Sequence, residues 1–382
     1  MPHQPVAIGR AAGRVLAEAV HARDPLPPFA SSAMDGFAVT PGPAGRRMAV
    51  VDESRAGRPA RRATSAQAAI RISTGAPLPD GATAVIPLER VEEESEEITL
   101  LAAVGDGDHV RRAGEELAAG VLALAPGLRL GPVELGVAAS AGRAELHCVR
   151  RPRVEVLVTG DELIPAGDPL GPGQIPESNG LVLAAAARAA GAQATTRPPL
   201  ADDPAVTRRR LADALQRCDV LVVCGGVSVG PHDHVRPALA ALDVSECFWR
   251  VALKPGKPIW FGRRAEQLVF GLPGNPVSAL VCFWLFVAPA LRALGGGVAL
   301  PGRGRARLGD SVPPARGRLQ AIRVRLEPTG ELPLAQPTGP QDSHRLTSML
   351  GADALALVPA SNAPTPAGTE VVIELVSTLA GA

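Results

Sequence analysis

Between residues 154 and 294 the apolar positions alternate between short continuous runs and longer stretches with helical spacing. RVEVLVTG (153–160), DVLVVC (219–224) and QLVFGL (267–272) are runs typical of strands buried on both faces. NGLVLAAAARAAGA (179–192) and AVTRRRLADALQR (205–217) have helical spacing, with a short strand expected between them at 193–197. This alternation predicts a mostly parallel sheet covered by helices.

Polar residues and prolines mark where these helices begin. Asp203 and Pro204 have the pattern of an N-cap followed by a first helical residue, and Asn179 is a candidate cap for its own helix. Asn275 and Pro276 open the most apolar stretch of the chain, at 277–294. That stretch contains a proline and lies between glycine-rich loops, so we expect a buried core helix rather than a membrane span.

The remaining segments have other patterns. Residues 1–23 are weakly helical, and residues 24–118 read as short strands and turns, with a solvated acidic hairpin rather than a metal site at 93–101. Residues 119–150 are apolar segments punctuated by glycine and proline. From about residue 299 the strand and turn pattern predicts a small β-barrel or β-sandwich.

Composition narrows the function classes. The 382 residues predict two to four domains, and 46% hydrophobic with 20% charged residues is the profile of a globular protein. A net charge of +1 argues against a large nucleic-acid footprint, and 3% aromatic residues without tyrosine argue against a stacking platform for single strands. The start has no signal-peptide core and the five cysteines form no Cys-x-x-Cys pair, so we expect buried free thiols in a cytoplasmic protein.

The distribution of lysine is unusual. Only two of the 39 basic residues are lysines, and both lie in one motif, Lys254-Pro-Gly-Lys257-Pro. Every other Lys or Arg position of the chain is arginine. The two lysines therefore indicate a place that needs a compact ammonium group rather than a guanidinium fork.

Three of the predicted parallel strands end in distinctive loops. These loops contain Asp161-Glu162, the glycine-rich run 225–230 and the run 272–276. Ligands of open parallel sheets bind beyond the carboxyl ends of the strands, so the three loops are expected to converge on one crevice. Glycines there let backbone N–H groups approach an anion. The dinucleotide and P-loop fingerprints are both absent from the sequence.

Carboxylates gather beside these loops, at Asp161, Glu162, Asp202 and Asp233. A phosphate site with nearby carboxylates usually needs a divalent cation, and Mg²⁺ suits one or two carboxylates together with phosphate oxygens. The run 232–234, His-Asp-His, resembles a transition-metal clip, but adjacent side chains point apart, which disfavours ligation by both histidines.

Eight motifs in order resemble those of the molybdopterin molybdenumtransferases, the MoeA family, which is related to the E domain of gephyrin. They are SSAMDGFAV (31–39), STGAPLPDGATAV (73–85), RRAGEE (111–116), TGDEL (159–163), GGVSVGPHD (225–233), WRVALKPGKP (249–258), GLPGNPVSA (271–279) and QDSH (341–344). The resemblance covers nearly the whole chain.

The resemblance implies a multidomain α/β protein with four domains. A split linker and dimerisation domain, helical and extended, is expected at 1–23 and 119–148, with a β-rich domain inserted at 24–118. A molybdopterin-binding domain, a mostly parallel α/β sandwich, is expected at 149–298. A C-terminal β-barrel is expected at 299–382. The split of the first domain follows from the resemblance alone.

The implied reaction combines adenylylated molybdopterin with molybdate, releases AMP and yields the molybdenum cofactor, with Mg²⁺ required. The implied assembly is a homodimer whose sites are shared between chains, with a molybdopterin adenylyltransferase as upstream partner and with neither nucleic acid nor membrane as a partner.

Motif matches and the loop argument together give the candidate site. Catalytic roles are expected for Asp35, Glu162, Asp202, Asp233, Arg250, Lys254 and Lys257. Metal ligation is expected for Glu162, Asp233 and Glu116. Substrate contacts or loop shaping are expected for Thr74, Gly225, Gly226, Ser228, Gly230, Pro273, Gly274, Asn275, Pro276 and Ser343.

Some of these positions carry an alternative or a departure. Thr74 could instead provide only a turn-forming hydroxyl. Glu116 stands where the family motif has aspartate, and Asp342 stands where it has glycine, which limits positive φ beside Ser343. Arg250 occupies a basic position that can be lysine in the family.

Two other functions remain open from the sequence. A molybdopterin adenylyltransferase would share the α/β domain, but it would not need the motifs at 31–85 and 341–344. A non-catalytic scaffold, which the gephyrin relative partly is, would not need the acids and lysines at the loops.

Overall fold

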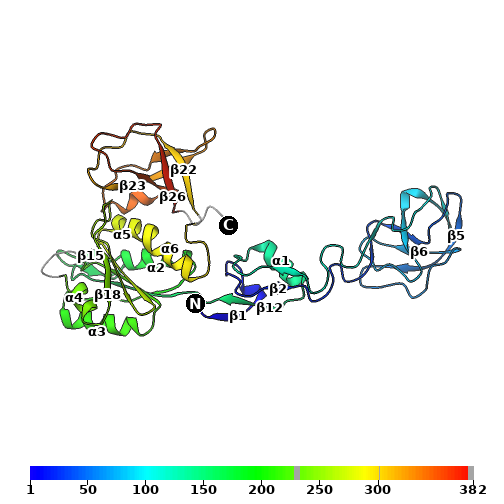
Figure 1. Cartoon of the computed structure of the whole chain (residues 1–382), viewed down its shortest axis with the longest axis horizontal. Helices are drawn as coiled ribbons and strands as arrows, with labels where there is room; N and C mark the ends of the chain where they lie inside the picture. Colours follow the sequence, from blue (N-terminus) through cyan, green and yellow to red (C-terminus); the bar gives the residue numbers. More distant parts are fainter. Residues whose placement is uncertain (228–232, 301, 377–382) are drawn as a thin grey trace. The chain divides into compact units, whose positions relative to one another are not determined.

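The computed structural model describes residues 1–227, 233–300 and 302–376, and these form two compact units. One unit is Pro5–Cys148, and the other begins at Val149 and includes Met1–Gln4. Ribbons of both are drawn in Figure 1. The second unit contains the α/β domain and a barrel.

The α/β domain is built on a six-stranded sheet with the order β16-β13-β17-β21-β20-β18. The first four strands run parallel, and β20 and β18 add an antiparallel edge. The predicted mostly parallel sheet is therefore confirmed. The strands are β13 Arg153–Val158, β16 Gln193–Thr196, β17 Val220–Cys224, β18 Ser245–Trp249, β20 Trp260–Arg264 and β21 Gln267–Leu272.

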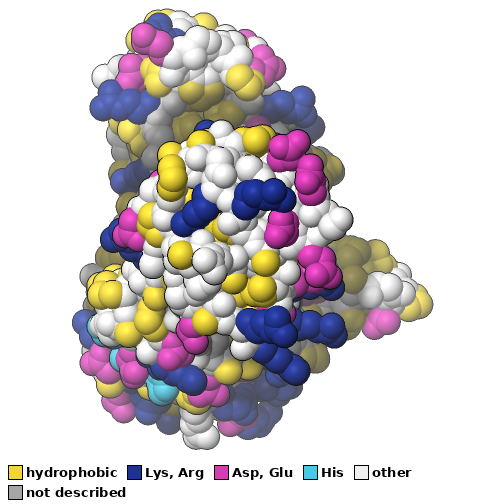
Figure 2. Space-filling view, turned by 90° about the vertical axis from the view of Figure 1, so that its right-hand side faces the viewer, with side chains coloured by type: hydrophobic (Ala, Val, Ile, Leu, Met, Phe, Trp, Pro, Cys, Tyr) yellow, Lys and Arg dark blue, Asp and Glu magenta, His cyan; other side chains and the backbone are white. Residues whose placement is uncertain are grey.

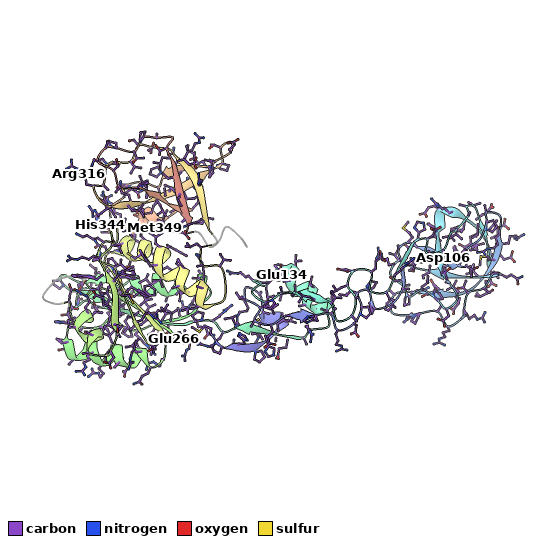
Figure 3. All side chains as sticks on the ribbon, in the orientation of Figure 1. Asp106, Glu134, Glu266, Arg316, His344 and Met349 are labelled. Atoms are coloured by element: carbon purple, nitrogen blue, oxygen red, sulfur yellow. The ribbon has the colours of Figure 1, made fainter. Side chains whose placement is uncertain are left out.

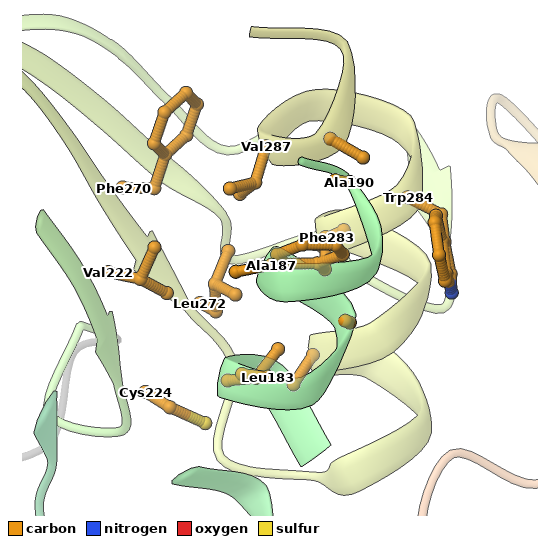
Figure 4. Close-up of a cluster of buried hydrophobic side chains, with 14 of the residues drawn as sticks. Leu183, Ala187, Ala190, Val222, Cys224, Phe270, Leu272, Phe283, Trp284 and Val287 are labelled. Atoms are coloured by element: carbon orange, nitrogen blue, oxygen red, sulfur yellow. The ribbon is translucent and has the colours of Figure 1, made fainter. Parts of the chain in front are cut away.

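Helices cover both faces of this sheet. Alternate strand residues point to opposite sides: Val222 joins a core with α2, α5 and α6, whereas Val223 joins a core with α3 and α4. Figure 4 shows the first core, where helix side chains such as Phe283 lie against the sheet. The helices are α2 Asn179–Ala189, α3 Pro204–Leu215, α4 Val235–Ala240, α5 Pro276–Cys282 and α6 Ala288–Leu294.

The helix starts agree with the sequence in one case and differ in another. Asp203 caps α3, its carboxylate accepting a hydrogen bond from the backbone N–H of Val206 at 2.7 Å, as predicted. Asn179 does not cap α2. It is the first helical residue, and its side-chain amide donates a hydrogen bond to the carbonyl of Gly274. The backbone N–H of Gly180 is bound instead by the Glu177 carboxylate at 2.6 Å.

The apolar stretch at 277–294 is helical throughout, but a π-helical segment, Phe283–Val287, separates α5 from α6. Among the described residues, Pro276–Leu294 is the one helix long and apolar enough to cross a membrane by length and composition, and 61% of its most apolar window is buried within the structure. Its side chains fill the core beneath the sheet, so the expected core helix is confirmed.

The C-terminal part is a closed five-stranded barrel, so the sequence alternative of a sandwich is not realised. Its ring runs β23-β24-β22-β26-β25 and closes because β23 also pairs with β25. The strands are β22 Arg303–Leu308, β23 Leu319–Glu327, β24 Leu334–Pro337, β25 Ala354–Val358 and β26 Glu370–Leu375, with a 3₁₀ turn at Leu346–Met349. The short strand β19, Leu253–Lys254, extends this sheet from the α/β domain by pairing with β23.

Within Pro5–Cys148, one six-stranded sheet has the order β7-β4-β6-β5-β9-β8, and the acidic run at 93–101 forms its expected hairpin. The predicted strands and turns of this region are thus confirmed. The strands are β4 Gly36–Val39, β5 Arg47–Ser54, β6 Ala68–Ile72, β7 Ala84–Pro87, β8 Val91–Glu94 and β9 Glu97–Leu100, with a 3₁₀ turn at Leu88–Arg90.

A second core in this unit joins residues from before and after the six-stranded sheet. Leu16 packs with Leu130 and Leu146 there, so the segments before and after the six-stranded sheet share one core. The weakly helical reading of 1–23 is wrong: β1 and a 3₁₀ turn, Ile8–Arg10, stand there, because strand pairing with later segments outweighs local propensity. The elements are β1 His3–Ala7, β2 Val20–His21, β3 Ser31–Ser32, β10 Val110–Arg111, β11 Leu122–Leu124, α1 Pro132–Ser140 and β12 Glu145–Val149.

The structure shows where the cysteines lie and how charged side chains are distributed over the surface. The expectation of buried free thiols holds for four of the five cysteines. The fifth, Cys247 on β18, is a free thiol but is exposed. Figure 2 shows basic and acidic side chains interspersed over the face that it presents, as a net charge near zero would suggest.

Candidate functional site

A cavity of about 660 Å³ opens at the carboxyl ends of β13, β17 and β21. All three loops singled out from the sequence line it, which confirms their predicted convergence. The barrel contributes His344, which lies between the barrel and the α/β domain (Figure 3). The loop residues on its wall are Thr159, Gly160, Glu162, Gly225, Gly226, Val227, Pro273, Gly274, Asn275 and Pro276.

Gly225 and Gly226 cannot be replaced without strain. Their φ angles are +94° and +64°, in the region that favours glycine, and a Cβ on Gly225 would lie 2.7 Å from the Thr159 hydroxyl oxygen. The two glycines therefore allow the β17 loop to pass close against the end of β13. Ser228 and Gly230, also expected in this loop, lie outside the described residues.

The predicted acids occupy the same cavity. Glu162, Asp202 and Asp233 line its wall, and the Asp161 carboxylate accepts a hydrogen bond from the backbone N–H of Asp202 at 3.0 Å. The Asp161 carboxylate therefore holds the backbone of this loop, whereas Asp202 lines the cavity. Glu177 adds a further carboxylate that sequence reasoning did not single out.

The fit of a divalent cation can be judged from these donors. Within residues 1–227, 233–300 and 302–376, no three His, Cys, Asp or Glu side chains are close enough together to form a metal cage. A cavity wall with separate carboxylates does fit Mg²⁺ in its usual mode, in which one or two carboxylates share the ion with phosphate oxygens and water. The donor set therefore suits an ion that arrives with a phosphate-bearing ligand.

Asn179 connects two walls of the cavity. Its amide nitrogen donates to the carbonyl of Gly274 at 2.7 Å and contacts the Cys224 sulfur at 3.4 Å, so the start of α2 is tied to the loop after β21. Sequence reasoning assigned Asn179 only to a cap. The signal that could have found it is the polar run Glu177-Ser178-Asn179, all three members of which line the cavity.

The Cys224 thiol lies at the base of this cavity but is unsuited to nucleophilic chemistry. Burial, reinforced by the negative charge of Glu177, raises the pKa of Cys224 to about 12, against a smaller opposing effect from the Asn179 hydrogen bond. The thiol therefore stays protonated at neutral pH. It donates a hydrogen bond to the carbonyl of Pro273 at 3.2 Å, which helps shape the loop.

The barrel loop 341–344 reaches the α/β domain through Ser343. The Asn275 amide donates to the Ser343 hydroxyl at 3.0 Å, and the Val277 backbone N–H donates to the Ser343 carbonyl at 3.1 Å. The departure at Asp342 is accommodated: its carboxylate pairs with Arg345 at 2.9 Å.

A buried guanidinium supports this loop from inside the barrel. Arg323 is fully buried and donates to the carbonyls of Pro340, Gln341 and Asp342 and to the Ser348 hydroxyl. Burial lowers the pKa of Arg323 to about 10, and the nearby Asp342 charge opposes that shift. The charge is held by carbonyl dipoles, which fix the backbone immediately before Ser343.

The expected basic residues lie beside the cavity rather than on its wall. Lys254, at the end of β19, and Lys257, on the turn that follows, are both exposed, and Pro258 on the same turn lines the cavity. Arg250 precedes this turn and lies over the Trp249 ring, 4.1 Å from its centroid. In the described part of the chain these three cations form no ion pair with a carboxylate, so their charges stay available to an anion.

Asp35, Thr74 and Glu116 belong to the unit Pro5–Cys148. There the Asp35 carboxylate accepts a hydrogen bond from the Thr74 backbone N–H at 2.8 Å, so these two are brought together. Among the described residues the Thr74 hydroxyl makes no hydrogen bond, and the turn-forming role considered for it is not seen. Glu116 is exposed, and its backbone N–H donates to the carbonyl of Leu26.

Family models match most of the chain in three pieces. Residues 1–142 match the MoeA N-terminal region (domain I and II), residues 155–293 a probable molybdopterin binding domain, and residues 305–376 the MoeA C-terminal region (domain IV). These matches cover both units of the structure.

Individual relatives agree. Molybdopterin molybdenumtransferase 2 of Mycobacterium tuberculosis is 37% identical over 96% of this chain and 93% of its own length. The molybdopterin molybdenumtransferase of Haemophilus influenzae is 37% identical over 75% of this chain and 71% of its own. The solved structure of a molybdopterin biosynthesis MoeA protein from Pyrococcus horikosii has a TM-score of 0.84 at 32% identity and covers 98% of this chain and 95% of that one. The chain therefore belongs to the MoeA family of molybdopterin molybdenumtransferases.

Proposed function

We propose that this protein inserts molybdate into adenylylated molybdopterin, releases AMP and so completes the molybdenum cofactor in the cytoplasm. The observation that carries the proposal is a cavity lined by a glycine-rich loop and separate carboxylates, with Lys254 and Lys257 exposed on the segment that leads to its wall at Pro258. A substrate with a phosphate–phosphate link and a second oxyanion could use all three features. A molybdopterin adenylyltransferase acting on the preceding step would supply the substrate.

Each part of the site has a distinct task in this proposal. The tight turn at Gly225 and Gly226, whose positive φ angles suit glycine, would leave room for phosphate oxygens beside backbone N–H groups. Lys254 and Lys257 attract the oxyanions and stabilise negative charge that develops on the departing AMP phosphate. Pro273 and Pro276 set the shape of the loop that faces them.

Glu162 and Asp233 are the side chains that would hold Mg²⁺, with Asp202 orienting molybdate or water. When bound, the ion would neutralise charge on the phosphate oxygens. The family resemblance adds Glu116 to this ligand set from the other unit. Removing the carboxylates should therefore weaken the response to Mg²⁺ more than it weakens substrate binding.

One turnover experiment separates this proposal from its alternatives. The protein is incubated with adenylylated molybdopterin, molybdate and Mg²⁺, and AMP is quantified; a parallel reaction contains molybdopterin and Mg-ATP. AMP in the first reaction alone supports the transferase. Product in the second alone would assign an adenylyltransferase, and binding without turnover in either would assign a scaffold.

We further propose that the protein is a homodimer whose sites combine residues of two chains. Asp35 and Thr74 are joined to each other in one unit, while the cavity acids lie in the other. In a closed two-fold dimer each site could take one set from each chain.

Complementation tests this arrangement. Asp35→Asn and Asp233→Asn should each be nearly inactive alone. Refolded as a mixture, random pairing gives roughly half heterodimers, each with one intact site, so roughly a quarter of all sites should work. Verified heterodimers with no recovered activity would place both residues in the site of a single chain.

A further inference from the structure

Two arginines lie over the same tryptophan ring at the edge of the α/β sheet. The guanidinium carbon of Arg236 is 3.7 Å from the Trp249 ring centroid, and that of Arg250 is 4.1 Å away. Both distances are well inside the range in which a cation is attracted to the negative face of an aromatic ring. Arg236 is on α4, Trp249 ends β18, and Arg250 follows directly after that strand.

The Arg236 side of this cluster is firmly anchored. Its Nη2 donates to the Glu246 carboxylate at 3.0 Å, and the same carboxylate oxygen accepts a hydrogen bond from the Trp260 indole at 2.6 Å. Trp249 also packs against the core beneath α3 and α4. The ring that Arg250 meets is therefore held from the sheet and from the helix.

Arg250 has an unusual backbone that brings it to this ring. Its φ is +64°, a left-handed conformation that costs a non-glycine residue about 1 kcal/mol or more. Adjacent residues of a strand normally point to opposite faces. The left-handed turn at Arg250 breaks that alternation, so its guanidinium contacts the ring of its own neighbour.

The cluster is connected along the chain to two parts of the candidate site. Arg236 follows Asp233, a cavity residue, by three positions, and Arg250 begins the segment that carries Lys254 and Lys257. The Arg250 backbone N–H also bonds the carbonyl of Ile259 at 2.9 Å, which closes the base of that segment.

We infer that Trp249 is a positioning residue that, with Arg236 behind it, holds the Arg250 guanidinium ready to receive a phosphate or molybdate oxyanion. This inference rests on the proposed function, because it gives Arg250 an anion to bind. A long arginine fixed against a rigid ring loses less side-chain freedom on binding, so the gain appears in affinity rather than in the chemical step. The indole is also placed to report that binding, because its fluorescence depends on the charge beside it.

The test uses inorganic pyrophosphate as the probe, with intrinsic fluorescence and calorimetric affinity as readouts. Trp249→Leu should bind pyrophosphate about five-fold more weakly, as expected for a lost cation–π contact, while Trp249→Phe should stay within about two-fold of wild type because it keeps an aromatic face. The fluorescence response should vanish in Trp249→Phe and persist in Trp284→Phe, whose ring lies in the core below α5.

Arg236→Lys provides a second variant that does not depend on replacing the indole. It keeps the charge facing Glu246 but loses the planar group on the ring, so it should also weaken pyrophosphate binding. Arg263→Lys, an exposed arginine on β20 of the same sheet, is the matched control and should bind as wild type.

The kinetic expectation is a raised KM with a nearly constant kcat in Trp249→Leu and Arg236→Lys. Wild-type pyrophosphate affinity in both variants would overturn the inference, and so would a loss confined to kcat. Neither result would touch the proposed function, which fails only if the wild-type protein releases no AMP from its substrate.

Discussion

The Asn275 amide donates a hydrogen bond to the Ser343 hydroxyl at 3.0 Å, and this contact joins the loop after β21 to the barrel. On the barrel side, the buried Arg323 fixes the backbone immediately before Ser343. On the other side, Asn179 holds the carbonyl of Gly274, next to Asn275. One wall of the cavity is therefore assembled from the α/β domain and the barrel together.

Removing this contact should lower activity without unfolding the protein. Asn275→Ala and Ser343→Ala each delete one partner of a neutral hydrogen bond worth about 1 kcal/mol, so kcat/KM should fall about five- to ten-fold. Thermal unfolding should change little because the Asn275 side chain is exposed and Ser343 is only half-buried. Ser361→Ala, at an exposed barrel turn, is the matched control. Two variants with wild-type kcat/KM would show that the barrel does not shape the site.

The two lysines should matter more than the arginines of strand β20. Lys254→Ala or Lys257→Ala removes a charge-stabilising donor, which typically lowers the rate about 10²–10³-fold. Arg264→Ala, on β20, removes a cation from the same domain and should leave AMP release within about two-fold. Steady-state AMP release with circular dichroism on each variant makes the comparison. Near-normal release from both lysine variants would remove them from the mechanism.

The cavity acids should change the response to magnesium. Glu162→Gln and Asp233→Asn each remove a charge from the cavity wall, so the Mg²⁺ concentration for half-maximal AMP release should rise about ten-fold or more while substrate affinity falls less. Glu266→Gln, an exposed carboxylate in the turn before β21, serves as control. Magnesium titrations that overlay the wild-type curve would mean that neither carboxylate holds the ion.

Acid stability should depend on Asp219, immediately before β17. Burial alone would raise its pKa, but hydrogen bonds from the Arg150 guanidinium and from Arg153 outweigh that effect and lower the pKa of Asp219 from 3.8 to about 2. A carboxyl whose folded pKa lies below its unfolded pKa stabilises the fold above pH 4, and that contribution disappears as the pH falls towards 2.

Asp219→Asn should therefore lower the free energy of unfolding by about 2 kcal/mol at pH 7, from a pKa difference of roughly 1.8. The difference from wild type should shrink below pH 4. Urea unfolding can be followed by tryptophan fluorescence, since all three tryptophans lie in the α/β domain. An equal difference at pH 3 and pH 7 would contradict the ionic origin of the effect.

The sequence was sufficient to predict the α/β layer and the convergence of its loops. The run 220–224 is apolar at every position because β17 is buried on both faces, and that pattern can be recognised in the sequence alone. The N-cap at Asp203 could also be predicted, because its signal is the adjacent pair Asp203-Pro204. Each of these features depends on residues close together in the chain.

Features that depend on partners far away in the chain could not be predicted from the sequence. Residues 1–23 form strands because residues such as Leu16 pack against segments more than 100 positions later, and only the family resemblance predicted that these distant segments belong together. Asn179 was assigned to a cap because its true partner, Gly274, is 95 positions away. The Trp249 cluster was missed because Arg250 takes a left-handed conformation that no strand pattern indicates.

The most direct measurement follows molybdenum and AMP in the same reaction. Purified protein, adenylylated molybdopterin and Mg²⁺ are titrated with molybdate, AMP is quantified by chromatography, and completed cofactor is quantified by reconstitution of a molybdenum-free apoenzyme. We expect AMP and completed cofactor to rise together in a one-to-one ratio, with both lost in Lys254→Ala. AMP release without any gain of active cofactor, or cofactor formed with the adenylyl group still attached, would contradict the account.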